Sequence, residues 1–202
     1  MRIKIFIDHA NFEIAWREEV GSCGGDLAWE ELPEVIMNHL SSISYLRQIE
    51  MELRGISVYA SVRQPGRQED RNFENWLRFE LDQLPGYTVK ISPRQRRVER
   101  CDKGHESVHY IEKGVDTKIV CDMMALAMRD LYDVAVIISD DSDLVPSVEC
   151  VQDVLDKHVV HVGFRRSGAQ IRSAAWSHLL LDDMISQMVQ PPKVKTAPAS
   201  PS

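Results

Sequence analysis

Apolar runs alternate with amphipathic stretches along most of the chain. The first run, Arg2 to Ile7, is rich in β-branched side chains and predicts a strand that ends at Asp8. Further strands are expected over residues 56–62, 87–91, 134–139 and 159–164. The later residues of the first strand are expected to be buried on both faces, and the strand at 134–139 is expected to be buried as well.

The stretches between these strands carry apolar residues at helical spacing. Helices are expected over residues 29–53, 73–84, 115–131 and 144–155, and residues 170–189 are mostly helical by pattern. The first helix is expected to be capped by Gly55, and the helix at 115–131, apolar almost all round, to be buried and entered through Gly114. Strands alternating with helices predict an α/β fold with a mostly parallel central sheet covered on both faces, a three-layer α/β/α domain.

Two segments leave alternatives open. Residues 93–103 and 108–113 have no helical stripe, and could pair as a small ribbon or form a loop. A short stretch that includes the first segment is basic, with Lys90, Arg94, Arg96, Arg97, Arg100 and Lys103 against the acids Glu99 and Asp102. Such a patch could contact phosphates.

Composition narrows the class of protein. The chain has 202 residues, 44% of them hydrophobic and 27% charged, which suits one soluble domain over residues 1–189 and a disordered Pro/Ser/Ala-rich tail over 190–202. No apolar stretch approaches the roughly 20 residues that a membrane span needs. Four cysteines without paired spacing, Cys23, Cys101, Cys121 and Cys150, favour reduced thiols and a cytoplasmic location. A net charge of -7 argues against coating nucleic acid by charge alone.

Several acids follow strands. Asp8 ends the first strand, Asp141 and Asp143 follow the strand at 134–139, and Asp116 near the start of a helix could join them. Since the carboxyl ends of parallel strands share one edge, these acids are expected to meet there. Clustered carboxylates repel unless a cation intervenes, and Mg²⁺ or Mn²⁺ would support phosphodiester hydrolysis. The alternative is that they are turn residues or helix caps, Asp143 for the helix at Leu144 and Asp116 for its own helix.

Three motifs resemble a known family. They are Phe6–Asn11, Glu112–Asp116 and Ile137–Pro146, in an order and spacing similar to the NYN domain, in particular its LabA-like branch. The resemblance implies a PIN-like nuclease fold and a divalent-metal-dependent ribonuclease. It also implies metal ligands at Asp8, Asp116, Asp141 and Asp143, with Asn11, Ser139 and Asp140 positioning them through hydrogen bonds.

The chain also departs from that family. His9 stands where the family often has glycine, and of a cysteine pair common before the second motif only Cys101 is present. Cys101, His105 and His109 could offer three ligands, but no fourth is evident, which favours a solvated loop over a zinc site. Asp122 lies on another side of its helix from Asp116 and is expected to be structural.

The leading hypothesis is an endonuclease that uses Mg²⁺ or Mn²⁺ and cuts single-stranded RNA, a substrate preference that comes from the resemblance alone. Basic residues expected to guide the strand are Arg94, Arg96, Arg97, Lys113, Arg165 and Arg166. The alternative is a non-catalytic module on the same fold that binds nucleic acid or a protein. A phosphatase is less suited, since that reaction requires a second acid at the position of Ala10.

The tryptophans are expected to be buried rather than to stack on bases. A homodimer is compatible with the sequence but not required by it.

Overall fold

The computed structural model describes residues 1–21, 25–64, 66–100 and 106–190. The strands are β1 (Arg2–Asp8), β2 (Asp26–Leu27), β3 (Glu52–Arg63), β4 (Tyr87–Arg100), β5 (Glu106–Ile111), β6 (Val134–Ile138), β7 (His158–Gly163), β8 (Ser177–Leu180) and β9 (Val189–Gln190). The helices are α1 (His9–Val20), α2 (Leu32–Leu40), α3 (Gln68–Phe79), α4 (Val115–Met128), α5 (Val145–Asp153), α6 (Ala169–Ala174) and α7 (Ile185–Met188). Short 3₁₀ turns are η2 (Leu81–Gln83), η3 (Ser142–Leu144) and η4 (Leu181–Asp183).

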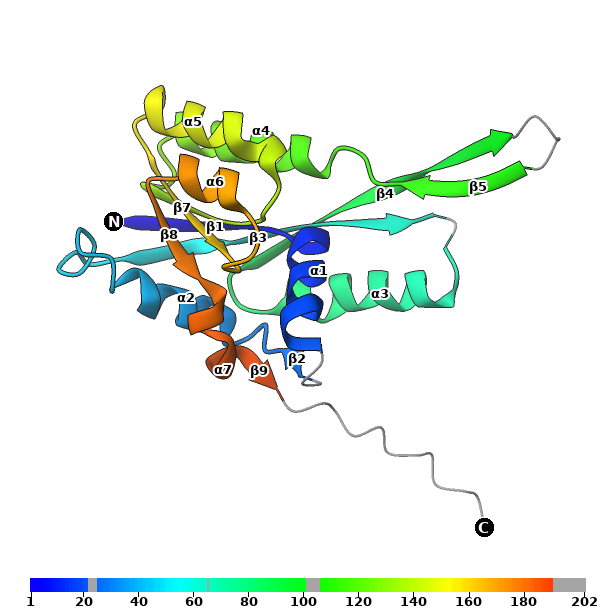
Figure 1. Cartoon of the computed structure of the whole chain (residues 1–202), viewed down its shortest axis with the longest axis horizontal. Coiled ribbons are helices and arrows are strands. Elements are labelled where there is room, and N and C mark those ends of the chain that lie inside the picture. Colours follow the sequence, from blue (N-terminus) through cyan, green and yellow to red (C-terminus); the bar gives the residue numbers. More distant parts are fainter. Residues whose placement is uncertain (22–24, 65, 101–105, 191–202) are drawn as a thin grey trace, which may run out of the picture.

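A seven-stranded sheet forms the middle layer, with the order β5-β4-β3-β1-β6-β7-β8. All neighbours are parallel except β4 and β5. Helices α4, α5 and α6 cover one face of the sheet, and α1, α2, α3 and α7 lie on the other (Figure 1). The expected three-layer α/β/α architecture with a mostly parallel sheet is therefore confirmed.

Strand β1 shows why an apolar run with no polar alternation suits the central position. Ile3, Ile5 and Ile7 pack into the core on the α1–α3 side, whereas Phe6 packs into the core on the α4–α6 side. Because successive side chains of a strand point to opposite faces, the part of β1 that is covered on both faces is apolar at each position, and Lys4 before it is only half-buried. All four side chains are fully buried.

Strand order places one edge of the sheet at a topological switch point. From β1 the sheet continues through β3 and β4 in one direction and through β6, β7 and β8 in the other. Ile7 pairs with Ile138, so the carboxyl ends of β1 and β6 lie side by side. In open α/β sheets a ligand crevice forms where neighbouring connections diverge in this way.

The long helix expected over residues 29–53 is wrong. Helix α2 has nine residues, 3₁₀-like turns follow, and β3 begins at Glu52. Gly55 is not a helix cap but lies inside β3 with φ +118, beside the irregular register between Ile3 and Ile5 of β1. A Cβ there would lie 3.1 Å from the Gly86 carbonyl oxygen, so the glycine serves a strand irregularity.

Two other regions differ from expectation. Helix α1 was not predicted, although Phe12, Trp16 and Val20 recur every four residues on its buried side. The segment 170–189 was expected to be mostly helical, but it holds strand β8 between the short helices α6 and α7. Strand β8 completes the sheet beside β7, a pairing partner that local pattern does not show.

Helix α4 begins after Gly114, whose φ is +80, as expected. It is not buried all round: Val115, Ile119, Met123 and Ala127 form one buried stripe, while Met128 is 72% exposed. The strands expected at 56–62, 87–91, 134–139 and 159–164 correspond to β3, β4, β6 and β7. The predicted tail from 190 onward lies outside the described residues apart from Gln190.

The open question at residues 93–113 is settled in favour of a ribbon. Strand β4 continues to Arg100 and pairs antiparallel with β5, from Gln95–Ile111 to Arg100–Glu106. The ribbon projects well beyond the helical layers (Figure 1). No helix in the described part of the chain is both long and apolar enough to cross a bilayer.

Candidate active site at the carboxyl edge of the sheet

Asp8 stands at the centre of this edge. It is the last residue of β1 and the N-cap of α1, where its Oδ1 accepts a hydrogen bond from the Asn11 backbone N–H at 3.2 Å. The Ser139 hydroxyl donates to its Oδ2 at 3.3 Å. Asp8 is 3% exposed, and burial, with repulsion from Glu112 and Asp116, raises its pKa to about 6.

Asp116 is close enough to the other acids to be repelled by their charges. It lies in the first turn of α4, and its pKa is raised by burial and then by repulsion from Asp141, Glu112 and Asp143. Since Glu112 and Asp116 also raise the pKa of Asp8, the side chains from β1, from α4 and from the loop after β6 form one electrostatic group. All four predicted metal ligands are therefore brought to the same edge of the sheet.

The loop after β6 is bonded to the end of β1. The Ser139 hydroxyl, which donates to Asp8, also accepts the Asp141 backbone N–H at 3.2 Å. The Asn11 side-chain oxygen accepts the Asp140 backbone N–H at 2.8 Å. Asn11 and Ser139 thus connect the end of β1 to this loop, and the roles predicted for Asn11, Ser139 and Asp140 in positioning metal ligands stay a prediction.

Asp140 itself points away from the other acids. Its Oδ1 lies 3.0 Å from His161 Nε2, and the Ser167 hydroxyl donates to its Oδ2. Added Cβ atoms at Gly163 and Gly168 would lie 2.3 Å and 2.1 Å from Asp140 Oδ1, so only glycine leaves room for this contact. The contacts of Asp140 with His161 and Ser167 fix one side of the loop that carries Asp141 and Asp143. The sequence did not indicate a role for His161, because a histidine within an apolar strand gives no sign of which residue it will contact.

The alternative reading of the acids as helix caps is only partly right. Asp8 and Asp141 are caps, and Asp141 Oδ1 accepts the Asp143 backbone N–H at 2.9 Å. Asp143 and Asp116, the two proposed as caps, are not: the N-caps of α5 and α4 are Leu144 and Gly114. Capping therefore leaves the convergence of all four acids unexplained.

Positive side chains lie around this edge rather than within it. Within the described residues, Asp8, Asp116, Asp141 and Asp143 form no ion pair. Glu112 accepts a hydrogen bond from the Ser61 hydroxyl and lies 3.9 Å from Arg94. Glu112, which the sequence motif contained without a role, is thus a fifth acid of the group.

The other basic residues predicted to contact nucleic acid are spread out. Arg96 and Arg97 are exposed on the ribbon, and Lys113 is exposed just before α4. Arg165 pairs with Asp183 at 3.8 Å and Arg166 with Glu19 at 3.7 Å, so both point to acids outside the group. Of the six, Arg94 is the one in contact with an acid of this edge.

Asp122 has the structural role expected of it. It accepts a hydrogen bond from the Tyr59 hydroxyl at 2.6 Å and pairs with Lys90, tying α4 to β3 and β4. Cys101 and His105 lie outside the described residues. His109 is exposed on β5, where its ring contacts the Ser107 hydroxyl at 2.9 Å.

The donor chemistry of this edge fits a hard divalent cation. The described ranges contain no group of three or more His, Cys, Asp or Glu side chains that could hold a metal ion. Mg²⁺ does not require one, because it retains several waters and commonly takes only one or two protein carboxylates together with substrate phosphates. Asp8 is buried and Asp116 half-buried, and the pKa of each is raised. Neither forms an ion pair with a described residue, so a cation would stabilise their charged forms.

Comparisons with known proteins agree with this architecture. The family model described as the NYN domain matches residues 2–181. A crystal structure of a protein of unknown function from Vibrio parahaemolyticus RIMD 2210633 is similar, with 21% identity over 94% of this chain and 96% of that one and a TM-score of 0.60. At that identity the likeness supports the fold alone. Among curated proteins, none matches at a significant level.

Proposed function

Because this chain belongs to the NYN domain family, whose members are PIN-like nucleases, we propose that it is an endonuclease that hydrolyses phosphodiester bonds in single-stranded RNA with Mg²⁺ or Mn²⁺. One observation carries the proposal: Asp8, Asp116, Asp141 and Asp143 lie at the switch point of the sheet and form no ion pair with any described residue. Burying like charges is unfavourable, and a bound cation is the simplest compensation. Membership of the LabA-like branch and a reducing, cytoplasmic location, suggested by the free thiols of Cys121 and Cys150, belong to the same proposal.

Asp8, Asp116, Asp141 and Asp143 would hold the cation. When bound, a divalent cation polarises a phosphate oxygen and lowers the pKa of a coordinated water. Asp8 has one oxygen fixed by the Asn11 N–H and the other by the Ser139 hydroxyl, so its carboxylate is oriented before any ligand arrives. Ser139 also sets the position of Asp141 through the backbone N–H. Such prior orientation reduces the cost of assembling the site.

Arg94 is positioned to bind the backbone of the substrate. It lies beside Glu112 at the rim, at the base of the ribbon that carries Arg96 and Arg97. An RNA strand that enters the acidic group needs cations along its path, because its phosphates are repelled by the same carboxylates. Lys113, Arg165 and Arg166 are exposed and would add weaker contacts.

The test is cleavage of end-labelled single-stranded RNA in the presence of Mn²⁺, Mg²⁺ or EDTA. Asp8→Asn and Asp141→Asn should each remove metal-dependent cutting. Asp133→Asn is the matched control, since Asp133 lies next to the amino end of β6 and pairs with Arg2. Cleavage by the wild type that survives both site variants would contradict the assignment of these residues.

A binding module that does not cut is the second candidate, and the same samples test it. RNA retained in a gel-shift assay without cleavage in either metal would support that alternative. Presence of all four acids speaks against it. A parallel assay with a phosphomonoester tests for a phosphatase. That activity would release phosphate from the phosphomonoester and leave the RNA uncut.

A further inference from the structure

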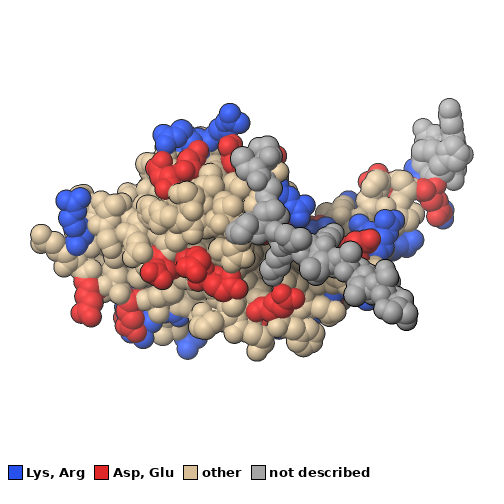
Figure 2. Space-filling view, turned by 90° about the horizontal axis from the view of Figure 1, so that it is seen from below, with Lys and Arg blue, Asp and Glu red and all other residues tan. Residues whose placement is uncertain are grey.

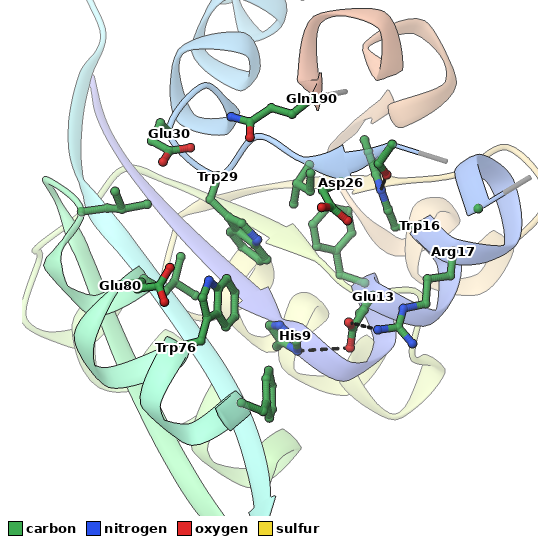
Figure 3. A pocket seen from close by; sticks show the side chains of 17 residues that line it. His9, Glu13, Trp16, Arg17, Asp26, Trp29, Glu30, Trp76, Glu80 and Gln190 are labelled. Carbon is green, nitrogen blue, oxygen red and sulfur yellow. Dashed lines mark hydrogen bonds and ion pairs between the residues drawn. The ribbon is translucent and has the colours of Figure 1, made fainter. Parts of the chain in front are cut away.

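A second concave site lies on the face of the sheet covered by α1 and α3. Its cavity has a volume of about 430 Å³, within the range of small-molecule sites. Helix α1, helix α3 with the following η2 turn, residues 25–30 and Gln190 enclose it (Figure 3). The four acids of the candidate active site do not line it.

Aromatic rings form the wall of this cavity. His9 stacks on Trp29 with ring centroids 5.8 Å apart, and Trp29 and Trp76 approach to 5.8 Å at an angle of 58°. Phe73 stacks on Trp76 at 6.0 Å. Figure 3 shows Trp29, Trp76 and His9 turned toward the middle of the cavity. Trp29 and Trp76, which the sequence assigned to the core, are only half-buried.

The charges around the rings are predominantly negative. Glu13, Asp26, Glu30 and Glu80 line the cavity, and Arg17 is the only basic side chain among its lining residues. Arg17 is already paired with Glu13 at 2.6 Å. In the described part of the chain, Asp26, Glu30 and Glu80 form no ion pair. Acidic side chains also spread across the middle of the face seen from below, while basic ones lie mostly toward its borders and on the ribbon (Figure 2).

His9 supplies a polar group at the inner end. Its side chain is 4% exposed, and its ring nitrogens make no hydrogen bond to any residue in the described ranges. The nearest carboxylate oxygen, on Glu13, is 3.9 Å from Nδ1. The ring of His9 lines the cavity, and a histidine ring nitrogen can donate or accept a hydrogen bond with a ligand group.

From this combination we propose that the cavity binds a small organic cation, an ammonium group on an apolar body. The negative faces of tryptophan rings attract an ammonium ion, and the effect is strongest where water is displaced. Carboxylates at the rim favour the same charge and disfavour phosphate-bearing ligands. None of the basic residues proposed to contact RNA lines this cavity, and its existence does not depend on nuclease activity.

A pair of probes with the same shape tests the role of charge. Choline has a positively charged quaternary nitrogen where its uncharged isostere, 3,3-dimethylbutan-1-ol, has a carbon atom. Each is titrated into the full chain in EDTA, without RNA, while tryptophan fluorescence and saturation-transfer NMR of the ligand methyl groups are followed. The proposal expects choline to bind at least about tenfold more tightly than the isostere.

Variants at the rim separate this site from general surface charge. Glu30→Gln with Glu80→Gln should weaken choline binding about three- to tenfold and leave the isostere unchanged, since both carboxylates are exposed and screened by solvent. Glu149→Gln, an exposed acid on α5 across the sheet, is the matched control and should change neither. Trp76→Leu should abolish choline binding, and its unfolding midpoint checks that the fold is kept.

Three results would overturn the proposal. They are equal binding of the two isosteres, choline binding that is lost equally in the Glu149→Gln control, and tighter binding of an uncharged nucleoside such as adenosine or cytidine. The last result would make the cavity a base-binding site. Failure of RNA cleavage would leave the choline measurement unaffected, so the two proposals fail independently.

Discussion

The two ends of the adjacent strands β1 and β6 place acids in opposite electrostatic settings. At the amino ends, Arg2 pairs with Asp133 at 2.6 Å and with Asp130 at 2.9 Å, and Lys157 adds a second cation to Asp130. Hydrogen bonds from Arg2 lower the pKa of Asp133 to about 2. At the carboxyl ends, Asp8 accepts hydrogen bonds but pairs with no described cation, and burial raises its pKa to about 6.

This contrast distinguishes acids that stabilise the fold from acids held for binding. A carboxylate whose pKa falls on folding favours the folded state at neutral pH, whereas one whose pKa rises opposes it. Both groups are attached to the same rigid strands, so the difference comes from neighbouring charge and burial. The carboxyl end is where a cation would gain most, and where substitution is expected to trade stability against activity.

The largest expected contrast is in RNA cleavage. Asp116→Asn should lower the rate by about 100- to 1,000-fold, because it removes a charge placed to hold the cation. Asp133→Asn, the same chemical change at the other end, should lower it less than about twofold. Initial rates on labelled RNA with Mn²⁺ measure both. Equal losses in the two variants would indicate a general effect on folding.

Removing the charge of Asp8 should stabilise the folded protein in EDTA. Asp8→Asn avoids ionising a buried carboxylate at pH 7, which is worth ~1–3 kcal/mol for a pKa shift from 3.8 to about 6. Asparagine can still cap α1. Urea unfolding monitored by circular dichroism tests this, and a variant less stable than the wild type would show that the carboxylate has a compensating partner.

Divalent cations should stabilise the wild type and not the site variants. At concentrations well above the dissociation constant, Mg²⁺ or Mn²⁺ should add about 1–3 kcal/mol to the free energy of unfolding. Asp8→Asn and Asp141→Asn should lose most of this gain, while Asp133→Asn should keep it. Thermal melts at fixed ionic strength with Mg²⁺, Ca²⁺ or added NaCl check specificity. A gain that is equal in every variant would point to non-specific screening.

The smallest effect is the pH dependence of the two ends. Because folding raises the pKa of Asp8, the wild type in EDTA should lose stability as the pH rises from 4 through about 6, and Asp8→Asn should lack this slope. Folding lowers the pKa of Asp133, so its contribution of about 1 kcal/mol is present above pH 4 and is lost toward pH 2. Unfolding curves of the wild type, Asp8→Asn and Asp133→Asn between pH 2 and 8 measure both effects. Parallel curves for wild type and Asp8→Asn would contradict the raised pKa.

Much of this fold could be predicted from the local spacing of apolar residues. The apolar runs of β1 and β6 and the stripe of α4 after Gly114 are visible without coordinates, because burial on one or two faces requires that spacing. Helix α2 was overextended, since apolar residues in the turns after Leu40 continue the stripe and pack on the core without being helical. Strand β8 was missed because its extended conformation depends on pairing with β7, a contact that the local pattern of residues 177–180 does not show.

The candidate site divides in the same way. Asp8, Asp116, Asp141 and Asp143 could be named from motifs and from their positions after strands, because parallel topology sends such residues to one edge. Their pKa shifts, the pairing of Asp140 with His161 and the cavity beside Trp29 and Trp76 arise only from packing between distant segments. The sequence alone determines which side chains are available and in what order they follow one another. Electrostatic environment depends on distance and burial, and those exist only once the sheet and its two helical layers have assembled.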